Sequence, residues 1–249
     1  MLGSSNSISD TNVVLNTAVA ESLRQYADKL EAETDFDTAL NSLIRETIRK
    51  HKRIIFNGNG YDDAWIREAT EERGLLNLRS TPDCMPYMLS VKNPKLFADH
   101  RVFTEAEVQS RYDITLENYC KTIHIEAATM VDMVRKEVLP AVSAYTGKVC
   151  GAGLAKKSFL TTLDTSYEEK LAVRLTELAQ LADREAIDLA EAVEKAESIR
   201  DLTDKAFCFK EKVCTRMETL RSYCDEAESL TEDACWPFPT YADLLFGVR

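Results

Sequence analysis

Apolar residues recur along most of this chain at the three- and four-residue spacing of amphipathic α-helices. In the N-terminal part, this spacing predicts a helix over residues 12–32. Asp35 offers an N-cap for a second helix that ends near residue 50. The residues on the two apolar faces are Val14, Leu15, Ala18, Val19 and Leu23 in the first helix, and Leu40, Leu43, Ile44 and Ile48 in the second.

A strand-like run, residues 53–56, interrupts the helical pattern. It ends in Asn57-Gly58-Asn59-Gly60, a strong turn signal because asparagine and glycine tolerate positive φ angles. A short helix is expected from Asp62 to Gly74, and Thr81-Pro82 opens another, with proline in the first turn. We therefore expect a short strand, a turn and small helices over residues 53–103.

The second half of the chain carries longer apolar stripes. Thr104 and Glu107 have capping-box spacing, and the stripe that follows predicts one helix over residues 104–145. At ~1.5 Å per residue this helix is roughly 60 Å long, and Pro140 is expected to kink it. Glycines at positions 147, 151 and 153 predict a flexible connector. Two further amphipathic helices are expected from Ser166 and from Leu202 onward.

Long helices with one apolar stripe each must bury those stripes against one another. The sequence therefore predicts a mainly α fold: an N-terminal helical segment, then an elongated bundle of long amphipathic helices over residues 104–249. The tail between Trp236 and Phe246 combines large apolar and aromatic residues with two prolines. We expect it to dock, either on this chain's own helices or on a partner subunit.

Composition and charge narrow the classes of function. The 249 residues carry a net charge of −11, and residues 166–235 alone hold 18 acidic and 10 basic side chains. This balance disfavours general binding to nucleic acid or to anionic membranes. There is no long apolar span and no secretory leader at the N-terminus. Seven cysteines without a C-x-x-C pair favour free thiols in a reducing cytoplasm.

A search for catalytic, cofactor-binding and metal-binding residues finds none that we assign. His124 and Glu126 are two residues apart, so a helix points their side chains in different directions and they cannot coordinate the same ion. The other candidates have plainer interpretations: a turn at 57–60, a helix N-terminus at Asp62 and Asp63, thiols at Cys208 and Cys214, and a basic surface at Arg45, Arg49, Lys50, Lys52 and Arg53. From the residues alone, this is a helical domain without an active site of its own.

Four stretches, in order along nearly the whole chain, resemble the C-terminal part of type III glutamine synthetases. They are LGSSNS with VLNTAVAESL at 2–23, KHKRIIFNGNGY at 50–61, SRY with KTIHIEA at 110–127, and WPFPTYADLLF at 236–246. The resemblance implies an enzyme that joins ammonia to glutamate with ATP and a divalent metal, usually magnesium. It also implies a homo-oligomer of stacked rings in the cytoplasm.

The family's metal ligands, nucleotide loop and glutamate motif have no counterpart in these 249 residues, so no catalytic residue is carried over. Met1 corresponds to an internal position of the family. We therefore expect residues 1–52 to be the end of a truncated catalytic domain. The segment 2–30 should then lack a packing partner and be the part of the chain least protected from hydrogen exchange.

Two functions remain open at this point. The first is the C-terminal portion of a type III glutamine synthetase, structural or assembly-related on its own. The alternative is a stand-alone, non-catalytic helical interaction module derived from that family. An independent small enzyme on a helical bundle has the least support, because no convergent set of polar groups is present.

Overall fold

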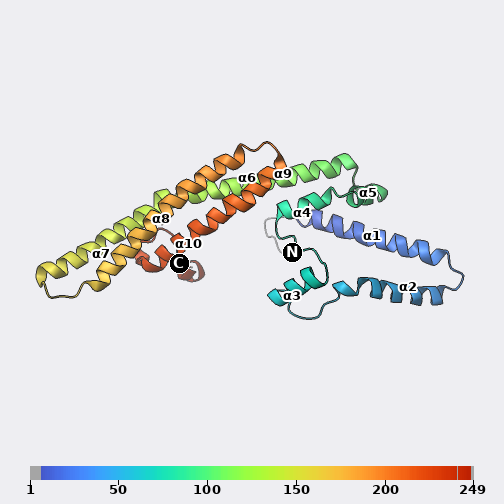
Figure 1. Ribbon diagram of the computed structural model, residues 1–249, viewed down its shortest axis with the longest axis horizontal. Coiled ribbons are helices and arrows are strands. Elements are labelled where there is room, and N and C mark those ends of the chain that lie inside the picture. Colours follow the sequence, from blue (N-terminus) through green and yellow to red (C-terminus); the bar gives the residue numbers. More distant parts are fainter. Residues whose placement is uncertain (1–6, 240, 248–249) are drawn as a thin grey trace. The chain divides into compact units, whose positions relative to one another are not determined.

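The structure, a computed structural model, describes residues 7–239 and 241–247. Its contacts divide the chain into two compact units, Met1–Thr115 and Leu116–Arg249 (Figure 1). The regular elements of the described residues are helical, and these residues contain no β-strand. The predicted mainly α fold is confirmed. The predicted segments 1–52 and 53–103 both fall within the first unit, and the division into three domains stays a prediction.

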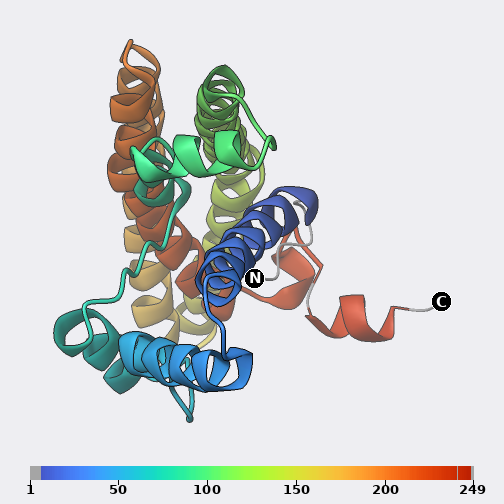
Figure 2. The ribbon, with the colours of Figure 1, turned by 90° about the vertical axis from the view of Figure 1, so that its right-hand side faces the viewer.

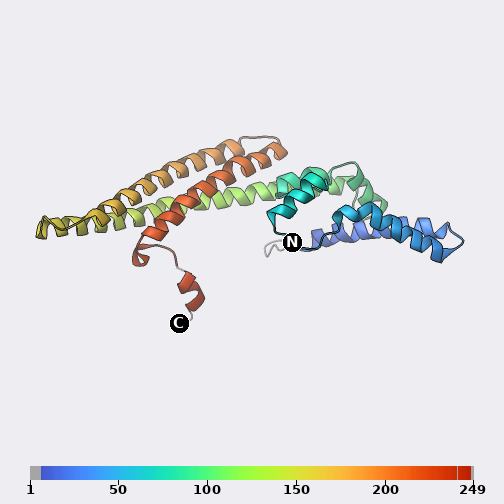
Figure 3. The same ribbon diagram turned by 60° about the horizontal axis from the view of Figure 1, so that its bottom comes forward.

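The first unit begins with a pair of antiparallel helices, α1 (Ser9–Glu31) and α2 (Phe36–His51), which Figure 3 shows on either side of a short turn. The carboxylate of Asp35 accepts a hydrogen bond of 3.2 Å from the amide of Thr38, so the predicted N-cap is confirmed. Across the pair, Lys29 Nζ lies 3.2 Å from Glu46 Oε1.

The apolar faces of these two helices are only partly covered. Leu43 of α2 is buried, but Leu15, Val19 and Leu23 of α1 are 58, 57 and 62% exposed. They lie at i, i+4 and i+8, so they form one stripe along α1. An exposed apolar stripe of this kind marks an interaction surface. Residues 1–6, the start of the first family-like stretch, lie outside the described residues.

The predicted strand at residues 53–56 is wrong. A single 3₁₀ turn, η1 (Lys52–Ile54), occupies this position, and no neighbouring strand exists among the described residues to pair with it. A strand's backbone groups need such a partner. Here the guanidinium of Arg73 takes part of that role: its Nη1 donates to the carbonyls of Arg53, at 3.1 Å, and Ile55, at 2.8 Å.

Small helices complete the first unit as predicted. One helical segment, α3 (Asp63–Arg67) with the π turn η2 (Glu68–Glu72), ends at Gly74, whose φ of 61° is the left-handed conformation of a C-terminal glycine. It is followed by α4 (Thr81–Met88), with Pro82 in its first turn, and by α5 (Lys92–Asp99).

The second unit is a bundle of three long helical segments, as predicted. The first is α6 (Glu105–Met133), which starts in the first unit and continues through the π turn η3 (Val134–Val138) into α7 (Leu139–Phe159). The second is α8 (Ser166–Glu197). The third consists of α9 (Leu202–Cys208), the π turn η4 (Phe209–Val213) and α10 (Cys214–Leu230). Figure 1 shows α8 returning along the first segment and α10 running in the same direction as that segment.

Apolar stripes from all three segments meet in the bundle core. One cluster joins Val138 and Val142, Leu175 and Leu178, and Ala227. The predicted capping box before α6 is also present: Glu107 Oε2 accepts from the Thr104 amide at 2.8 Å, and the Glu107 amide donates to Thr104 Oγ1 at 3.3 Å. None of the helices within the described residues combines the length and the hydropathy needed to cross a membrane.

The flexible connector predicted at Gly147, Gly151 and Gly153 is wrong, because α7 continues through all three glycines to Phe159. A glycine inside a helix costs about 1 kcal/mol relative to alanine. Packing of α7 on α8 offsets this cost. A Cβ built on Gly153 would lie 3.4 Å from the Cβ of Glu168, an ordinary contact distance, so α7 and α8 lie side by side at this position.

The structure shows a local change in the long helix next to Pro140, while the predicted kink stays a prediction. The turn before Pro140 widens to a π turn, in which the Leu139 amide donates to the carbonyl of Val134, five residues back. Proline has no amide hydrogen and its ring clashes with the carbonyl four residues earlier. A wider turn makes room for the ring, so the chain stays helical on both sides.

Among the described residues of the tail, Trp236 and Phe238 dock on the bundle. Trp236 and Phe238, which follow the turn η5 (Asp233–Cys235), are half-buried and pack against the core cluster around Val138 and Leu178. The short helix α11 (Tyr241–Phe246) has Leu244, Leu245 and Phe246 exposed by 69, 69 and 82%. Figures 2 and 3 show α11 standing away from the three long segments of its unit. Docking in cis is thus observed for Trp236 and Phe238.

Candidate functional site

The structure separates the residues that the sequence had singled out as possible ligands. His124 Nδ1 lies 3.0 Å from Glu197 Oε1 at the end of α8, and Glu126 does not join this pair. Lys205 Nζ of α9 lies 3.2 Å from the other oxygen of Glu197. Burial alone would raise the pKa of Glu197, but hydrogen bonds from His124 and Lys205 outweigh it and hold that pKa below its usual range.

This cluster at Glu197 is a structural contact between three helices. The His124 ring also stacks on Phe209, with ring centroids 6.4 Å apart. Among the described residues, no group of three or more His, Cys, Asp or Glu side chains could hold a metal ion.

The turn at residues 57–60 is held by an aromatic stack rather than built around a ligand. Phe56 stacks on Trp65 with ring centroids 3.7 Å apart, and the Arg73 guanidinium lies 4.9 Å from the centre of the Trp65 ring. A Cβ on Gly58 would come within 2.8 Å of the Phe56 ring, so glycine is needed there. Asp62 caps α3 by accepting from the Ala64 amide at 3.0 Å, as predicted.

Of the predicted basic surface, Lys52 and Arg53 lie in the turn η1, and Arg45, Arg49 and Lys50 lie on α2. Ser42, Arg45, Glu46, Arg49 and Lys50 line an open hollow of about 720 Å³ on this one helix. Because Glu46 is engaged with Lys29 of α1, the arginines and Lys50 dominate the charge of this face. A single exposed helix face can attract an acidic surface, but it does not enclose a small substrate.

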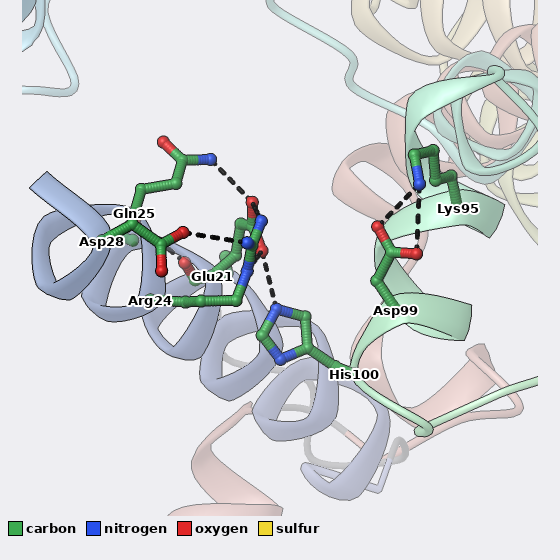
Figure 4. Close-up of polar contacts among 9 residues, drawn as sticks. Glu21, Arg24, Gln25, Asp28, Lys95, Asp99 and His100 are labelled. Atoms are coloured by element: carbon green, nitrogen blue, oxygen red, sulfur yellow. Dashed lines mark hydrogen bonds and ion pairs between the residues drawn. The ribbon is translucent and has the colours of Figure 1, made fainter.

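A polar cluster around Glu21 is the most connected polar site of the first unit (Figure 4). Glu21 lies in the middle of α1. Its Oε1 accepts from Arg24 and Gln25, both at 2.7 Å, and its Oε2 lies 2.8 Å from His100 Nε2, just after α5. Arg24 also reaches Asp28 at 3.1 Å. The Glu21 carboxylate is thus in contact with a guanidinium, a side-chain amide and an imidazole.

These contacts strongly favour the charged form of Glu21. Hydrogen bonds from Arg24, Gln25 and His100, in that order, lower the pKa of Glu21 to about 2. The side chain is a carboxylate at neutral pH and does not serve as a general acid. Its arrangement instead fixes α1 against the end of α5, next to a Lys95–Asp99 pair with a separation of 2.9 Å on α5 itself.

The second unit carries an apolar groove between α6 and α10. Its volume is about 580 Å³, and Trp236 and Phe238 of the tail line it. The apolar side chains from the helices are Ile125, Met130, Met133, Val134, Val138 and Met217. Charged residues of α10, among them Arg221 and Asp225, also line it. The groove offers apolar contact surface and no arrangement of acid, base and nucleophile.

Comparisons with known proteins agree with this picture of a helical domain. Residues 39–157 match the family model described as the glutamine synthetase C-terminal domain. The chain is 31% identical over 252 residues to the type-3 glutamine synthetase of Dictyostelium discoideum. The match covers 98% of this chain and 34% of that protein. This chain is a relative of type III glutamine synthetases.

Two bacterial proteins extend the comparison. A glutamine synthetase of Butyrivibrio fibrisolvens is 39% identical over 210 residues, covering 84% of this chain and 30% of the relative. A glutamine synthetase of Bacteroides fragilis is 27% identical over 254 residues, covering 98% of this chain and 34% of the relative. The chain thus spans about a third of the length of the curated relatives it matches. The resemblance deduced from the four stretches is confirmed.

Sequence reasoning missed the cluster at Glu21. The spacing of Glu21, Arg24 and Gln25 at i, i+3 and i+4 is a visible signal for pairing within one helix. His100, however, is 79 residues from Glu21 in the sequence, and no local sequence pattern predicts their contact. The exposed stripe on α1 agrees with the expectation, drawn from the family resemblance, that residues 2–30 lack a packing partner.

Proposed function

We propose that this chain forms the C-terminal helical part of a type III glutamine synthetase, in which it serves packing and assembly rather than catalysis. The exposed stripe Leu15, Val19 and Leu23 on α1 carries this proposal. An apolar stripe of this kind that is exposed to water indicates that another protein surface covers it in the complete assembly. The relatives hold about two thirds of their length outside the matched region, and that part is the covering surface.

In this proposal, ATP, magnesium and glutamate bind in the part of the synthetase that this chain does not span. The chemistry, ligation of ammonia to glutamate with ATP, belongs to the whole enzyme. The described residues contribute what their geometry supports: a rigid three-segment bundle, the Glu21 cluster that holds α1, and apolar and basic surfaces. A homo-oligomer in the cytoplasm is the setting in which these surfaces would act.

The test joins this chain to the remaining two thirds of the Butyrivibrio fibrisolvens relative. We expect the chimera to form glutamine from glutamate, ammonia and ATP, and this chain alone to form none. Adding Leu15→Asp and Val19→Asp to the chimera should lower activity and loosen the assembly, because charge on the stripe opposes its burial. The matched control is Val173→Asp, at an exposed position of α8.

Turnover by this chain alone would contradict the proposal. A folded but inactive chimera would contradict it too, and would favour the alternative, an independent helical interaction module. The exposed Leu244, Leu245 and Phe246 of α11 are the surface through which such a module would bind another protein. Size-exclusion chromatography with light scattering follows assembly in each case.

A further inference from the structure

Lys148 and Cys235 meet on the surface of the bundle, where the turn η5 packs against α7. Lys148 Nζ lies 2.9 Å from Cys235 Sγ. Glu232 Oε2 lies 3.4 Å from the same sulfur and 3.7 Å from the same nitrogen. Among the described cysteines, this is the one with a lysine amine at hydrogen-bonding distance. The sulfur therefore lies between an amine and a carboxylate.

The surroundings of this sulfur differ from those of the buried thiols. The hydrogen bond with Cys235, together with the charge of Glu232, raises the pKa of Lys148, so a lysine ammonium group lies beside the sulfur. The thiolate is the form of a cysteine that oxidants attack. Burial instead raises the pKa of the Cys120 and Cys214 thiols, and that of Cys224 to about 11.

Access and reach complete the arrangement. Cys235 is half-buried and Lys148 is exposed, so a small oxidant can reach the sulfur from solvent. The lysine side chain is long and rotatable. Only a small movement separates a 2.9 Å contact from a covalent bond. The two residues are 87 positions apart in the chain, so a bond between them would close a long loop.

We propose that Cys235 and Lys148 are a modification site at which a peroxide drives a covalent sulfur–nitrogen cross-link between η5 and α7. In the first step the Cys235 thiolate attacks a peroxide oxygen, the O–O bond breaks, hydroxide leaves, and sulfur loses two electrons to become a sulfenic acid. In the second, the Lys148 ammonium gives one proton to that hydroxide, which becomes water, and the free amine attacks the sulfur. The S–N bond forms, the S–O bond breaks, and hydroxide leaves with the second amine proton as water.

The atoms balance: one thiol, one amine and one hydrogen peroxide give one S–N bond and two waters. A thiol reductant reverses the cross-link, because a sulfenamide is opened by thiols as a disulfide is. The consequence in this fold is mechanical. Cys235 immediately precedes Trp236, so the cross-link would attach the docked residues Trp236 and Phe238 covalently to α7. This inference does not depend on the proposed function.

The experiment treats the whole chain with increasing hydrogen peroxide and analyses it by peptide mass spectrometry without reduction. We expect the Lys148 peptide joined to the Cys235 peptide, lighter than their sum by about 2 Da and separated again by dithiothreitol. Lys148→Arg keeps the positive charge but has no amine that condenses. This variant should still form the sulfenic acid at Cys235, trapped by dimedone, and no cross-link. Cys150→Ser, an exposed cysteine on α7, is the matched control and should cross-link as the parent does.

Three results would overturn the proposal. Cys235 could oxidise to the sulfinic acid with Lys148 unlinked, or fail to react. The two peptides could be joined with a mass about 14 Da above their sum, which would mean an N–O–S bridge and a different step. Lysine could also be found linked to Cys150. Circular dichroism of the variants checks that each remains helical, which is expected because both substituted positions lie at the surface.

Discussion

His100 Nε2 lies 2.8 Å from Glu21 Oε2, and this contact ties the middle of α1 to the end of α5. The two residues are 79 positions apart, so the contact is tertiary. It stands beside the local contacts of Glu21 with Arg24 and Gln25. The stripe of exposed leucine and valine on α1 contributes little to holding that helix. The first unit therefore depends on polar contacts for the placement of α1.

Glu21→Gln should weaken the first unit at neutral pH and leave it unchanged near pH 2. The pKa of Glu21 is lowered from 4.5 to about 2, so its contribution is complete above its usual pKa and disappears as the pH falls toward 2. The measurement is the urea midpoint as a function of pH, followed by fluorescence of Trp65 in a Trp236→Phe background. Asp28→Asn, whose partner Arg24 is also held by Glu21, is the control. A gap between variant and parent that persists to pH 2 would contradict the assignment.

The amides of α1 should exchange hydrogen faster than those of α6 within the bundle. Exchange protection follows the free energy of local opening, which is low for a helix with few buried apolar contacts. Among the residues of α1, Thr17 is buried, whereas α6 buries Leu116 and Ala127 completely. Mass-spectrometric hydrogen exchange of the isolated chain tests this. In the chimera with the remainder of a synthetase, α1 should become protected, and equal protection of α1 and α6 in the isolated chain would refute the idea.

Leu178→Ala should destabilise the second unit by about 2–5 kcal/mol, because Leu178 is 0% exposed and its removal leaves a cavity. Urea unfolding followed by Trp236 fluorescence gives the change in free energy. Val173→Ala, 58% exposed on the same helix, should change it by no more than about 0.5 kcal/mol. Equal effects of the two substitutions would mean that the face of α8 has been assigned incorrectly.

Trp236→Ala should lower the thermal stability of the bundle without changing its oligomeric state. Trp236 packs in cis against the core cluster, and its half-buried ring makes an edge contact with Phe238 at 6.2 Å. Truncating a half-buried tryptophan costs about 2 kcal/mol, below the range for a fully buried one. Differential scanning calorimetry and light scattering report the two quantities. A lower mass at unchanged melting temperature would instead assign Trp236 to a contact between subunits.

Helical periodicity alone predicted most of the fold. The apolar stripes predicted after Thr104, from Ser166 and from Leu202 marked the helix faces that form the bundle core, because a helix buries one face wherever a partner exists. Periodicity says nothing about whether the partner is present, and the exposed face of α1 is the result. It failed where tertiary context overrides local propensity. The run at 53–56 has strand-forming residues, but the described residues contain no strand to pair with it. The glycines at 147, 151 and 153 lie inside α7, and Gly153 faces Glu168 of α8.

The candidate site was less predictable than the fold. Capping groups such as Asp35 and Asp62 were readable because their partners lie within three residues. The Glu21–His100 and Lys148–Cys235 contacts join positions 79 and 87 residues apart. No periodicity or motif connects such positions, since their proximity depends on how whole helices are placed. The family resemblance supplied the enzyme to which the chain is related, but it assigned no residue in these 249.

The wide turn before Pro140 also gives the long helix a place where its length can vary. A π turn holds one residue more than an α-helical turn while leading the chain in nearly the same direction. Deleting one residue between Val134 and Val138, together with Pro140→Ala, would close the turn to an ordinary one. The faces of α6 and α7 would keep their orientation. Elsewhere in these helices, a single deletion would rotate everything beyond it by about 100° and expose the core. A single-residue deletion should therefore be tolerated at this turn and rejected on either side.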